Sequence, residues 1–504
     1  MTKFEIPRYD DTVDLVPFGL PQILDFEIAA EELENINAQF YDEPLPPDEA
    51  GIRQARLHPV VVSKEGGYDE LLPSDGQPSH IEVLPEQDYT VKSIGGNDVA
   101  AWLGEWIPVP FLREDKGKTH EDGEPCFVQG PSNWARARMT RVEKNGKFFY
   151  RVVLAFDMQV EDQPNSEQLV ALSPEDIWSR SNFRLAYKPR DNAWFINLKW
   201  IDDWLHFVWN RYLAKNNIRN RIRRDTLFYL GSYLVYLEML SRAIRNVRVR
   251  SADTKLPPVE VDLVLDIGNS RTTGLLIEED PALGKGRSLN DSYSLQLRDM
   301  DRPENVYMEP FSTRVEFSKT RFGLDLSVEE DDGFSSDSGR RQQAFQWVSC
   351  VRTGKEAERL ASRSATTEGS TGMSSPKRYL WDENPWLASW RYNMQGFQQN
   401  EPHPFCALTA GLNDSGRPLC SLGDTRVRVP DKDEASQPCF FYHFTRSSMM
   451  MFLFIEILQQ ALLTINSPSQ RCRRSSKGVP RRLRKIIFTT PAGMPAAEQQ
   501  IYRR

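Results

Sequence analysis

A chain of 504 residues that is 39% hydrophobic and 27% charged, with a formal net charge of −8, has the balance of a folded globular protein. Its length is enough for about three domains, and its composition excludes wholesale disorder. The mild negative charge gives no general attraction to nucleic acid or to an anionic membrane surface, so neither is expected as a partner.

The six cysteines and six histidines are scattered along the chain, without a CxxC pair or an HExxH motif. Neither a disulfide framework nor a zinc site is therefore predicted. The N-terminus lacks the apolar segment of a secretory signal. Two apolar stretches, at 227–240 and 449–465, are shorter or more polar than a membrane-spanning helix requires, and we expect them to be buried core helices. A cytoplasmic protein without a membrane span follows, with export to a host cell as an open alternative.

Residues 1–250 contain no catalytic motif. A run rich in Val, Phe and Tyr at 148–156 predicts a strand, whereas the charged stretch at 114–124 predicts a loop. From 201 to 247, apolar residues recur at three- and four-residue spacing, as on one face of a helix. Eight tryptophans lie in this half of the chain. A binding groove is one use for them, but large aromatic side chains more often fill a core.

The polar, proline-containing residues 251–258 separate this helical stretch from the strands that follow, and we place a domain boundary there. The predicted fold class is α/β. Residues 1–250 are expected to form an α+β region in which strands precede helices. Residues 251–504 are expected to form a second region that mixes strands and helices.

Residues 259–278 are predicted to form two strands joined by a polar turn, with the first strand ending at Asp266 and the second beginning near Thr273. The residues between them are small or polar: Gly268, Asn269, Ser270, Arg271 and Thr272. Such a turn can point backbone N–H groups and hydroxyls at a phosphate, and Gly268 lets the backbone approach a ligand closely. Asp266 is placed to meet an accompanying Mg²⁺ through a water molecule. An ordinary polar hairpin is the alternative.

Three later stretches also carry signals. Lys377 follows glycines and hydroxyl residues and suits a terminal phosphate as a point charge, with an exposed surface lysine as the alternative. Residues 445–465 predict a strong helix with Ser447 or Ser448 as its N-cap. Residues 471–485 carry eight Lys or Arg and no acid. Because no aromatic residue interleaves these cations, a solvated loop is favoured over a nucleic-acid site.

Three of these segments occur in the order of one superfamily. Residues 266–274, DIGNSRTTG, resemble the first phosphate-binding hairpin of the actin, Hsp70 and sugar-kinase superfamily. Residues 354–382 resemble the Hsp70 region in which a helix leads to a Lys-Arg pair, and Lys377 falls where that family has its catalytic lysine. The helix at 447–465 and the following IIFTTPAGMPAAEQQIYRR resemble the helix, strand and helix passage of Hsp70.

This resemblance implies that residues 251–504 form an incomplete, ribonuclease H-like first lobe of an actin/Hsp70-like ATPase, with ATP and Mg²⁺ as cofactors. Asp266 would meet Mg²⁺ through water, the turn from Gly268 to Thr273 would hold the β- and γ-phosphates, and Lys377 would steer the attacking water or neutralise charge. A second phosphate hairpin and an adenosine loop are missing from the sequence. We therefore expect a truncated chain whose second lobe belongs to a longer or a separate chain, with little ATP hydrolysis by itself.

Along its whole length, the chain resembles the N-terminal half of the virulence factor SrfB family, bacterial proteins with an Hsp70/actin-like region. The resemblance implies a virulence-associated protein with an ATP-binding region and a protein partner of unknown identity. The alternative is a non-catalytic interaction or scaffold protein that keeps the fold without turnover. The tryptophan-rich N-terminal region favours this alternative. Arg271 places a bulky cation inside the turn, which could strengthen anion binding or block it.

Overall fold

The structure is a computed structural model. It describes residues 4–16, 20–45, 54–62, 68–70, 80–81, 90–160, 171–218, 227–251, 256–279, 289, 292–318, 321–322, 345–347, 349–363, 371–382, 393, 446–472, 474 and 476–503. Helices and sheets both contribute, so the chain is an α+β protein. Residues 386–438 lie outside these ranges except for Asn393.

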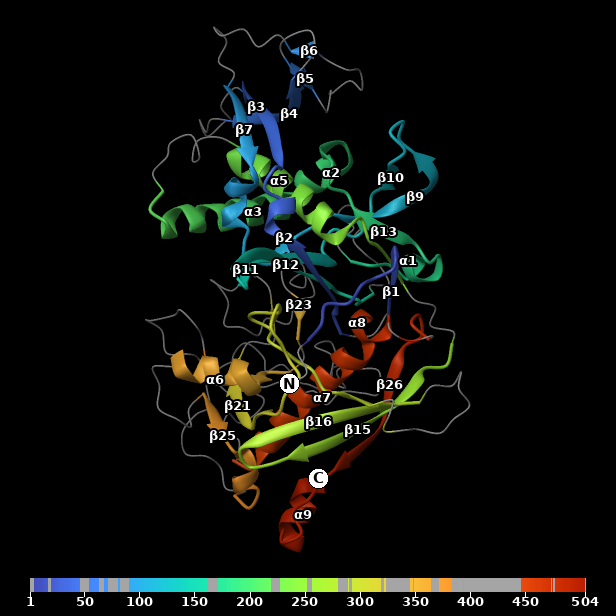
Figure 1. The fold of residues 1–504 in the computed structure, drawn as a ribbon, viewed down its shortest axis with the longest axis vertical. Coiled ribbons are helices and arrows are strands. Elements are labelled where there is room, and N and C mark those ends of the chain that lie inside the picture. The colour runs from blue at the N-terminus through green and yellow to red at the C-terminus, as the bar shows by residue number, and fades with distance from the viewer. Residues whose placement is uncertain are drawn as a thin grey trace, which may run out of the picture.

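Sheets dominate the N-terminal half (Figure 1). The first sheet contains, in spatial order, β1 (Thr12–Leu15), β14 (Arg248–Ser251), β13 (Asn182–Leu185), β9 (Phe111–Thr119) and β10 (Pro125–Val128). The second contains β2 (Gln22–Ala29), β12 (Lys147–Phe156), β11 (Ala135–Lys144) and β8 (Ile107–Pro108). The third contains β6 (His80–Ile81), β5 (Tyr68–Glu70), β4 (Gln54–Val62), β3 (Asn37–Leu45) and β7 (Thr90–Gly95).

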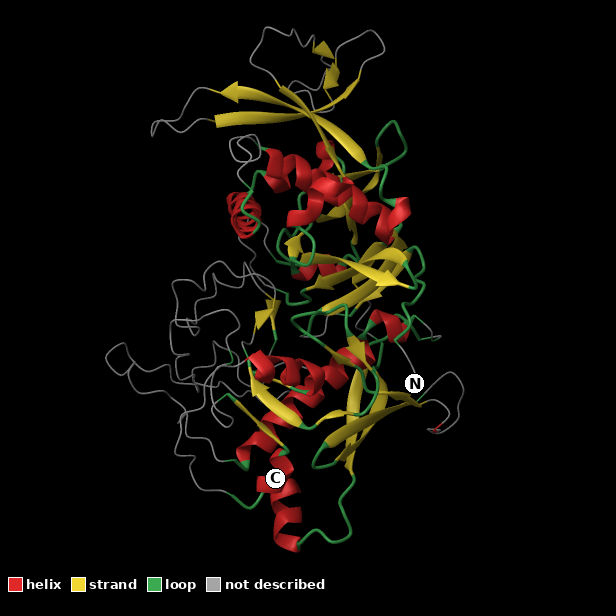
Figure 2. Cartoon of the chain, turned by 60° about the vertical axis from the view of Figure 1, so that its left-hand side comes forward, coloured by secondary structure: helices red, strands yellow, loops and turns green. Residues whose placement is uncertain are grey.

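Helices fill the space between the third sheet and the other two, as Figure 2 shows. The helical elements of this half are η1 (Ala30–Glu32), η2 (Gly96–Ala101), α1 (Pro174–Trp178), α2 (Pro189–Ile196), α3 (Lys199–Lys215) and α5 (Phe228–Ile244). The two long helices, α3 and α5, confirm the helical prediction for 201–247 within the described residues. Their apolar faces, together with Trp102, Trp204 and Trp209, form the core of this half. The core role predicted for the tryptophans is confirmed for these three and for Trp134, whereas Trp178 is 81% exposed and is not a core residue.

The strand prediction for 148–156 is confirmed, because β12 covers it. The loop prediction for 114–124 is wrong over its first six residues. Strand β9 continues to Thr119 and forms an antiparallel hairpin with β10. A charged sequence tolerates this conformation because the outer end of the hairpin is exposed, and its backbone groups are paired across the two strands.

The second half is organised around a mixed sheet. Its strands, in spatial order, are β17 (Ser292–Ser294), β16 (Arg271–Glu278), β15 (Val259–Ile267) and β26 (Arg481–Phe488), and β20 (Phe311–Ser312) also pairs with β16. The pairs β15–β16 and β16–β17 are antiparallel, whereas β26 runs parallel to β15. A strand that runs parallel to its neighbour needs a crossover connection. In the described chain, helix α7 (Ser448–Asn466) and the short helix α8 come before β26, so α7 belongs to that connection.

The smaller elements of the second half surround this sheet. They are β18 (Leu297–Arg298), β19 (Val306–Tyr307), β21 (Arg314–Phe317), β22 (Arg321–Phe322), β23 (Phe345–Gln346), β24 (Val351–Arg352), α6 (Gly354–Arg363), β25 (Gly372–Ser374), η7 (Pro376–Tyr379), α8 (Pro468–Arg471) and α9 (Ala496–Arg503). Strand β21 pairs with both β24 and β25, so the segment that carries Lys377 is anchored beside the main sheet.

Helix α7 is the central helix of the second half. Its window Met449–Asn466 is long and apolar enough to cross a membrane by length and composition, but 78% of that window is buried inside the protein. Its polar side chains make hydrogen bonds inside the protein. Glu456 accepts one from the Trp347 indole at 2.9 Å. The Gln460 amide accepts one from the Arg298 N–H and donates one to the Arg298 carbonyl. The core-helix prediction for 449–465 is therefore confirmed.

Hydrophobic contacts divide the described residues into two main cores. One core draws on residues from Val13 to Val249, and the other on residues from Val261 to Tyr502 together with Val16 and Leu20. The N-terminal segment thus reaches across to the second core. The division of the chain at residue 250 into two domains stays a prediction.

The basic stretch at 471–485 is wrongly predicted as a solvated loop. Arg471 and Arg481 are each 1% exposed, and the second half of the stretch is strand β26. The Arg481 guanidinium donates to the Glu278 carboxylate at 2.7 Å, and Arg484 pairs with Asp262 at 2.6 Å. These cations neutralise acidic residues of neighbouring strands. The sequence could not reveal this pairing because the partners lie about 200 residues away.

A buried ion pair joins the two halves. The Arg298 guanidinium on β18 donates to both Asp25 carboxylate oxygens on β2, at 2.9 and 2.7 Å. Asp25 is 0% exposed and Arg298 is 5% exposed. Because a buried charge is tolerated only when it is paired, this contact should be necessary for stable packing of β18 against β2.

We expect Arg298→Met to lower the free energy of unfolding by about 3 kcal/mol, because the buried Asp25 carboxylate loses its bidentate partner. Lys199→Met, which removes an exposed ion pair with Asp203, is the matched control and should leave the unfolding midpoint close to wild type. Urea unfolding measures both. A midpoint for Arg298→Met that equals the control's would show that the pair is not important for stability.

Candidate functional site

The turn between β15 and β16 is tight and closes on itself. Ile267 pairs with Thr272 in the hairpin register, and the Gly268 N–H donates to the Arg271 carbonyl at 2.9 Å. A Cβ atom at position 268 would lie only 2.7 Å from that carbonyl oxygen, so the turn requires glycine there. Asn269 and Ser270 form the exposed tip. The turn is open to solvent, as an anion-binding turn must be.

Side chains of the hairpin alternate between the two faces of the sheet. Asp266 and Thr273 are directly opposite each other and both are exposed, as is Arg271. Thr272, in contrast, is 1% exposed, and its hydroxyl is hydrogen-bonded to the Thr313 hydroxyl at 2.8 Å. Thr272 therefore supports the turn from the inside and does not present its hydroxyl at the surface with Asp266.

Thr489 holds the Asp266 side chain. This threonine directly follows β26, and its N–H donates to the Leu265 carbonyl at 3.0 Å, which continues the parallel pairing by one residue. Its hydroxyl donates to Asp266 Oδ1 at 2.6 Å. One carboxylate oxygen of Asp266 is thereby fixed in place at the exposed end of the sheet.

Lys377 reaches the same end of the sheet from η7. Ser375 has a left-handed backbone with φ of 53° and Pro376 begins η7, so the chain turns sharply just before the lysine. The Lys377 ammonium donates to the Ile267 carbonyl at 2.5 Å and lies 5.0 Å from the centre of the Tyr502 ring. Burial lowers the pKa of Lys377, and the nearby Asp266 carboxylate partly opposes that shift.

Thr313 connects the turn to the segment that carries Lys377. Its N–H donates to the Ser270 carbonyl at 3.0 Å, and its own carbonyl accepts from the Ser375 N–H at 2.8 Å. Its hydroxyl makes the bond with Thr272 already described. Sequence reasoning missed Thr313, Thr489 and Tyr502, because each acts through a contact that is distant in sequence. Among them, Thr489 and Tyr502 lie in residues 486–504, a segment that the resemblance had singled out.

The donor set at this site suits a hydrated divalent cation. Among the described residues, no group of three or more His, Cys, Asp or Glu side chains could hold a metal ion directly. Asp266 offers a single exposed carboxylate. Mg²⁺ keeps several waters and is commonly bound by one or two carboxylates plus substrate phosphates, so Asp266 fits a cation that arrives with a phosphate ligand.

A family comparison covers almost the whole chain: the model described as "Virulence factor SrfB" matches residues 3–504. This chain belongs to the virulence factor SrfB family. Membership points to a virulence-associated protein, and the family description names no ligand or reaction. Comparisons of this SrfB-family chain with curated proteins and with solved structures gave no match.

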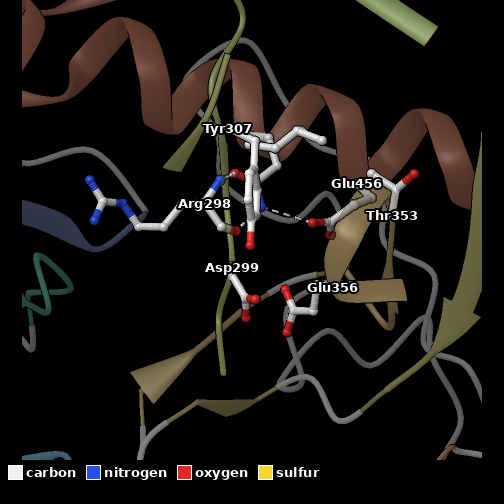
Figure 3. Close-up of a pocket in the computed structure, with 8 residues that line it drawn as sticks. Arg298, Asp299, Tyr307, Thr353, Glu356 and Glu456 are labelled. Carbon is white, nitrogen blue, oxygen red and sulfur yellow. Dashed lines mark hydrogen bonds between the residues drawn. The ribbon is translucent and has the colours of Figure 1, made fainter. Parts of the chain in front are cut away.

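A second feature of this SrfB-family chain is a small, partly open cavity (Figure 3), which has a volume of about 10 Å³. That is the space of one water molecule. Its lining residues are Leu297, Arg298, Asp299, Tyr307, Thr353, Glu356, Glu456 and Gln460. None of them is a predicted site residue, and the cavity is too small for a nucleotide or a substrate.

Glu356 is the chemically unusual residue of this cavity. In Figure 3 its carboxylate and that of Asp299 lie beside one another. Glu356 accepts hydrogen bonds from the Met300 and Asp301 N–H groups at 2.9 and 3.2 Å. Burial, and then the negative charge of Asp299, raise the pKa of Glu356 to about 8. The group therefore fastens the loop after β18 to α6, and it keeps its proton at neutral pH.

We expect stability to fall as pH rises from about 5 to about 8. The folded chain keeps the Glu356 proton up to a pKa of about 8, whereas the unfolded chain releases it near the ordinary value of 4.5. Between these values the folded state binds more protons, so raising the pH favours unfolding. Urea midpoints across this range measure the slope. Glu356→Gln should flatten it, whereas Glu358→Gln, an exposed position on the same helix, should not. A wild-type slope in Glu356→Gln would disprove the assignment.

Proposed function

We propose that this chain binds the phosphates of ATP together with Mg²⁺ at the turn between β15 and β16, as part of an actin/Hsp70-like nucleotide-binding region. The observation that carries the proposal is the meeting of Asp266 and Lys377 at that turn. The two residues come from distant segments, yet the Lys377 ammonium is bonded to the residue directly after Asp266. A carboxylate, a cation and an exposed glycine turn are the parts that phosphate binding with a metal requires.

The strand order of the second half supports the proposal. An antiparallel unit, β17-β16-β15, is extended by a parallel strand, β26, that follows a helix. This is the arrangement expected of a ribonuclease H-like lobe, in which the first hairpin carries the phosphate-binding turn. In this proposal β15 and β16 correspond to that first hairpin.

Each residue would have a distinct task. Asp266 would hold Mg²⁺ through water, and the bound cation would supply charge neutralisation for the phosphates. The N–H groups and side chains of Asn269 and Ser270 lie at the exposed tip, where phosphate oxygens can accept hydrogen bonds from them. Lys377 would add a point charge beside the turn, and the exposed Arg271 would extend the positive potential.

Binding without turnover is the second candidate, in which the chain acts as a scaffold controlled by a bound nucleotide. Its support is the position of the Lys377 ammonium, which is bonded to the Ile267 carbonyl and lies near the Tyr502 ring. A lysine held in this way can fix a phosphate electrostatically without steering a water molecule. Heat of Mg·ATP binding without release of inorganic phosphate would favour this candidate.

We expect the wild-type chain to bind Mg·ATP and Asp266→Asn to weaken that binding about tenfold, because the anion that fixes the hydrated cation is lost. Isothermal titration calorimetry measures the affinity, and removal of Mg²⁺ with a chelator should weaken wild-type binding similarly. Asp203→Asn, at an exposed position on α3, is the control. Wild-type affinity in Asp266→Asn, or no binding by the wild-type chain, would refute the proposal.

A further inference from the structure

We propose that Thr489 and Tyr502, both on the segment that follows β26, are positioning residues that hold Asp266 and Lys377 in place for the ligand. This inference rests on the proposed function of the turn and adds two residues to it. Neither residue touches the tip of the turn in the described structure. Each instead contacts one of the two charged groups of the site.

The argument for Thr489 begins with its backbone. The bond from its N–H to the Leu265 carbonyl sets Thr489 beside Asp266 at the end of two parallel strands. The hydroxyl then donates to Asp266 Oδ1 at 2.6 Å, although both residues are exposed. A surface carboxylate would otherwise sample several rotamers. Fixing it before the ligand arrives reduces the entropy that binding must lose.

The argument for Tyr502 rests on two observations. Its ring is 4% exposed and lies 5.0 Å from the Lys377 ammonium, a cation–π distance. Together with the Ile267 carbonyl, the ring confines that ammonium to one position next to the turn. In addition, the Tyr502 hydroxyl is buried without a hydrogen-bond partner among the described residues. This hydroxyl can therefore still donate to a water molecule or to a ligand.

The protonation state of Tyr502 agrees with a donor role. Burial, and then the Asp266 carboxylate, raise the pKa of Tyr502 to about 12. The phenol therefore keeps its proton at neutral pH, and the ring stays uncharged beside the Lys377 ammonium. The contacts of Thr489 with Asp266, and of Lys377 with Ile267 and Tyr502, bring α9, the end of β26, η7 and the hairpin together at one site.

The first test is a double-mutant cycle on Mg·ATP affinity measured by calorimetry. Thr489→Val keeps the shape of the side chain and should weaken binding about fivefold, the usual effect of one lost hydrogen bond. In the Asp266→Asn background the same change should have no further effect, because Thr489 acts through the Asp266 carboxylate. Thr490→Val, at the exposed neighbouring position, is the control. Equal losses in both backgrounds would overturn the role of Thr489.

The second test needs no nucleotide, so it separates this inference from the proposed function. Acetylation of Lys377 by acetic anhydride is followed by mass spectrometry. Tyr502→Leu should raise the rate about fivefold because the ring no longer confines the ammonium, whereas Tyr502→Phe keeps the ring and should react like wild type. Lys199, exposed on α3, gives the internal reference rate.

An unchanged Lys377 rate in Tyr502→Leu would overturn the role of Tyr502, provided that circular dichroism shows a wild-type fold. If the wild-type chain binds no Mg·ATP but the labelling result is as expected, the proposed function fails and the placement of Lys377 by Tyr502 stands. If Mg·ATP binds and the labelling rate does not respond, the proposed function stands and the positioning role of Tyr502 fails.

Discussion

Three hydrogen bonds at Thr313 hold the candidate site together. Two involve its backbone and reach Ser270 in the turn and Ser375 before Lys377, and the third joins its hydroxyl to that of Thr272. Thr313 is 2% exposed, so these bonds lie out of competition with water. The turn and the lysine come from segments about 100 residues apart, and this buried residue joins them together with the bond from Lys377 to the Ile267 carbonyl.

Buried polar groups also fix the relative positions of larger elements of the protein. Helix α7 is apolar enough to suggest a membrane helix, yet its Glu456 and Gln460 bind the Trp347 indole and the Arg298 backbone within the core. Arg298 in turn binds Asp25 of the N-terminal half. Such buried polar bonds are directional, so they fix the register of β18 against α7 and β2 in a way that apolar contacts alone do not.

Sequence reasoning predicted the elements of the site better than its contacts. The hairpin and helix α7 follow from local composition and period, which a single chain displays directly, whereas Lys377 was singled out by the resemblance to Hsp70. The inward position of Thr272 also follows from strand alternation once the register is known. In contrast, the contacts of Thr313, Thr489 and Tyr502 depend on tertiary packing, and no local pattern encodes them.

The prediction made from the charge pattern of residues 471–485 was wrong for a related reason. The cations at 471–485 look like a free basic surface in sequence, but Arg481 and Arg484 find acidic partners on β15 and β16. The sequence shows the number of charges, and only the folded chain shows which of them remain available. The same argument applies to Glu356, whose unusual pKa arises from burial and from Asp299 on a different segment.

Hydrogen–deuterium exchange of Thr313→Val tests the central claim most directly. This change leaves the buried Thr272 hydroxyl without its partner, a cost of about 1–3 kcal/mol that should loosen the segments on both sides of Thr313. Thr490→Val, at an exposed position outside both peptides, serves as the control. We expect faster exchange in the peptide over 268–273 and in the peptide over 375–380, relative to wild type and control. Faster exchange in only one of them, or in neither, would contradict the account.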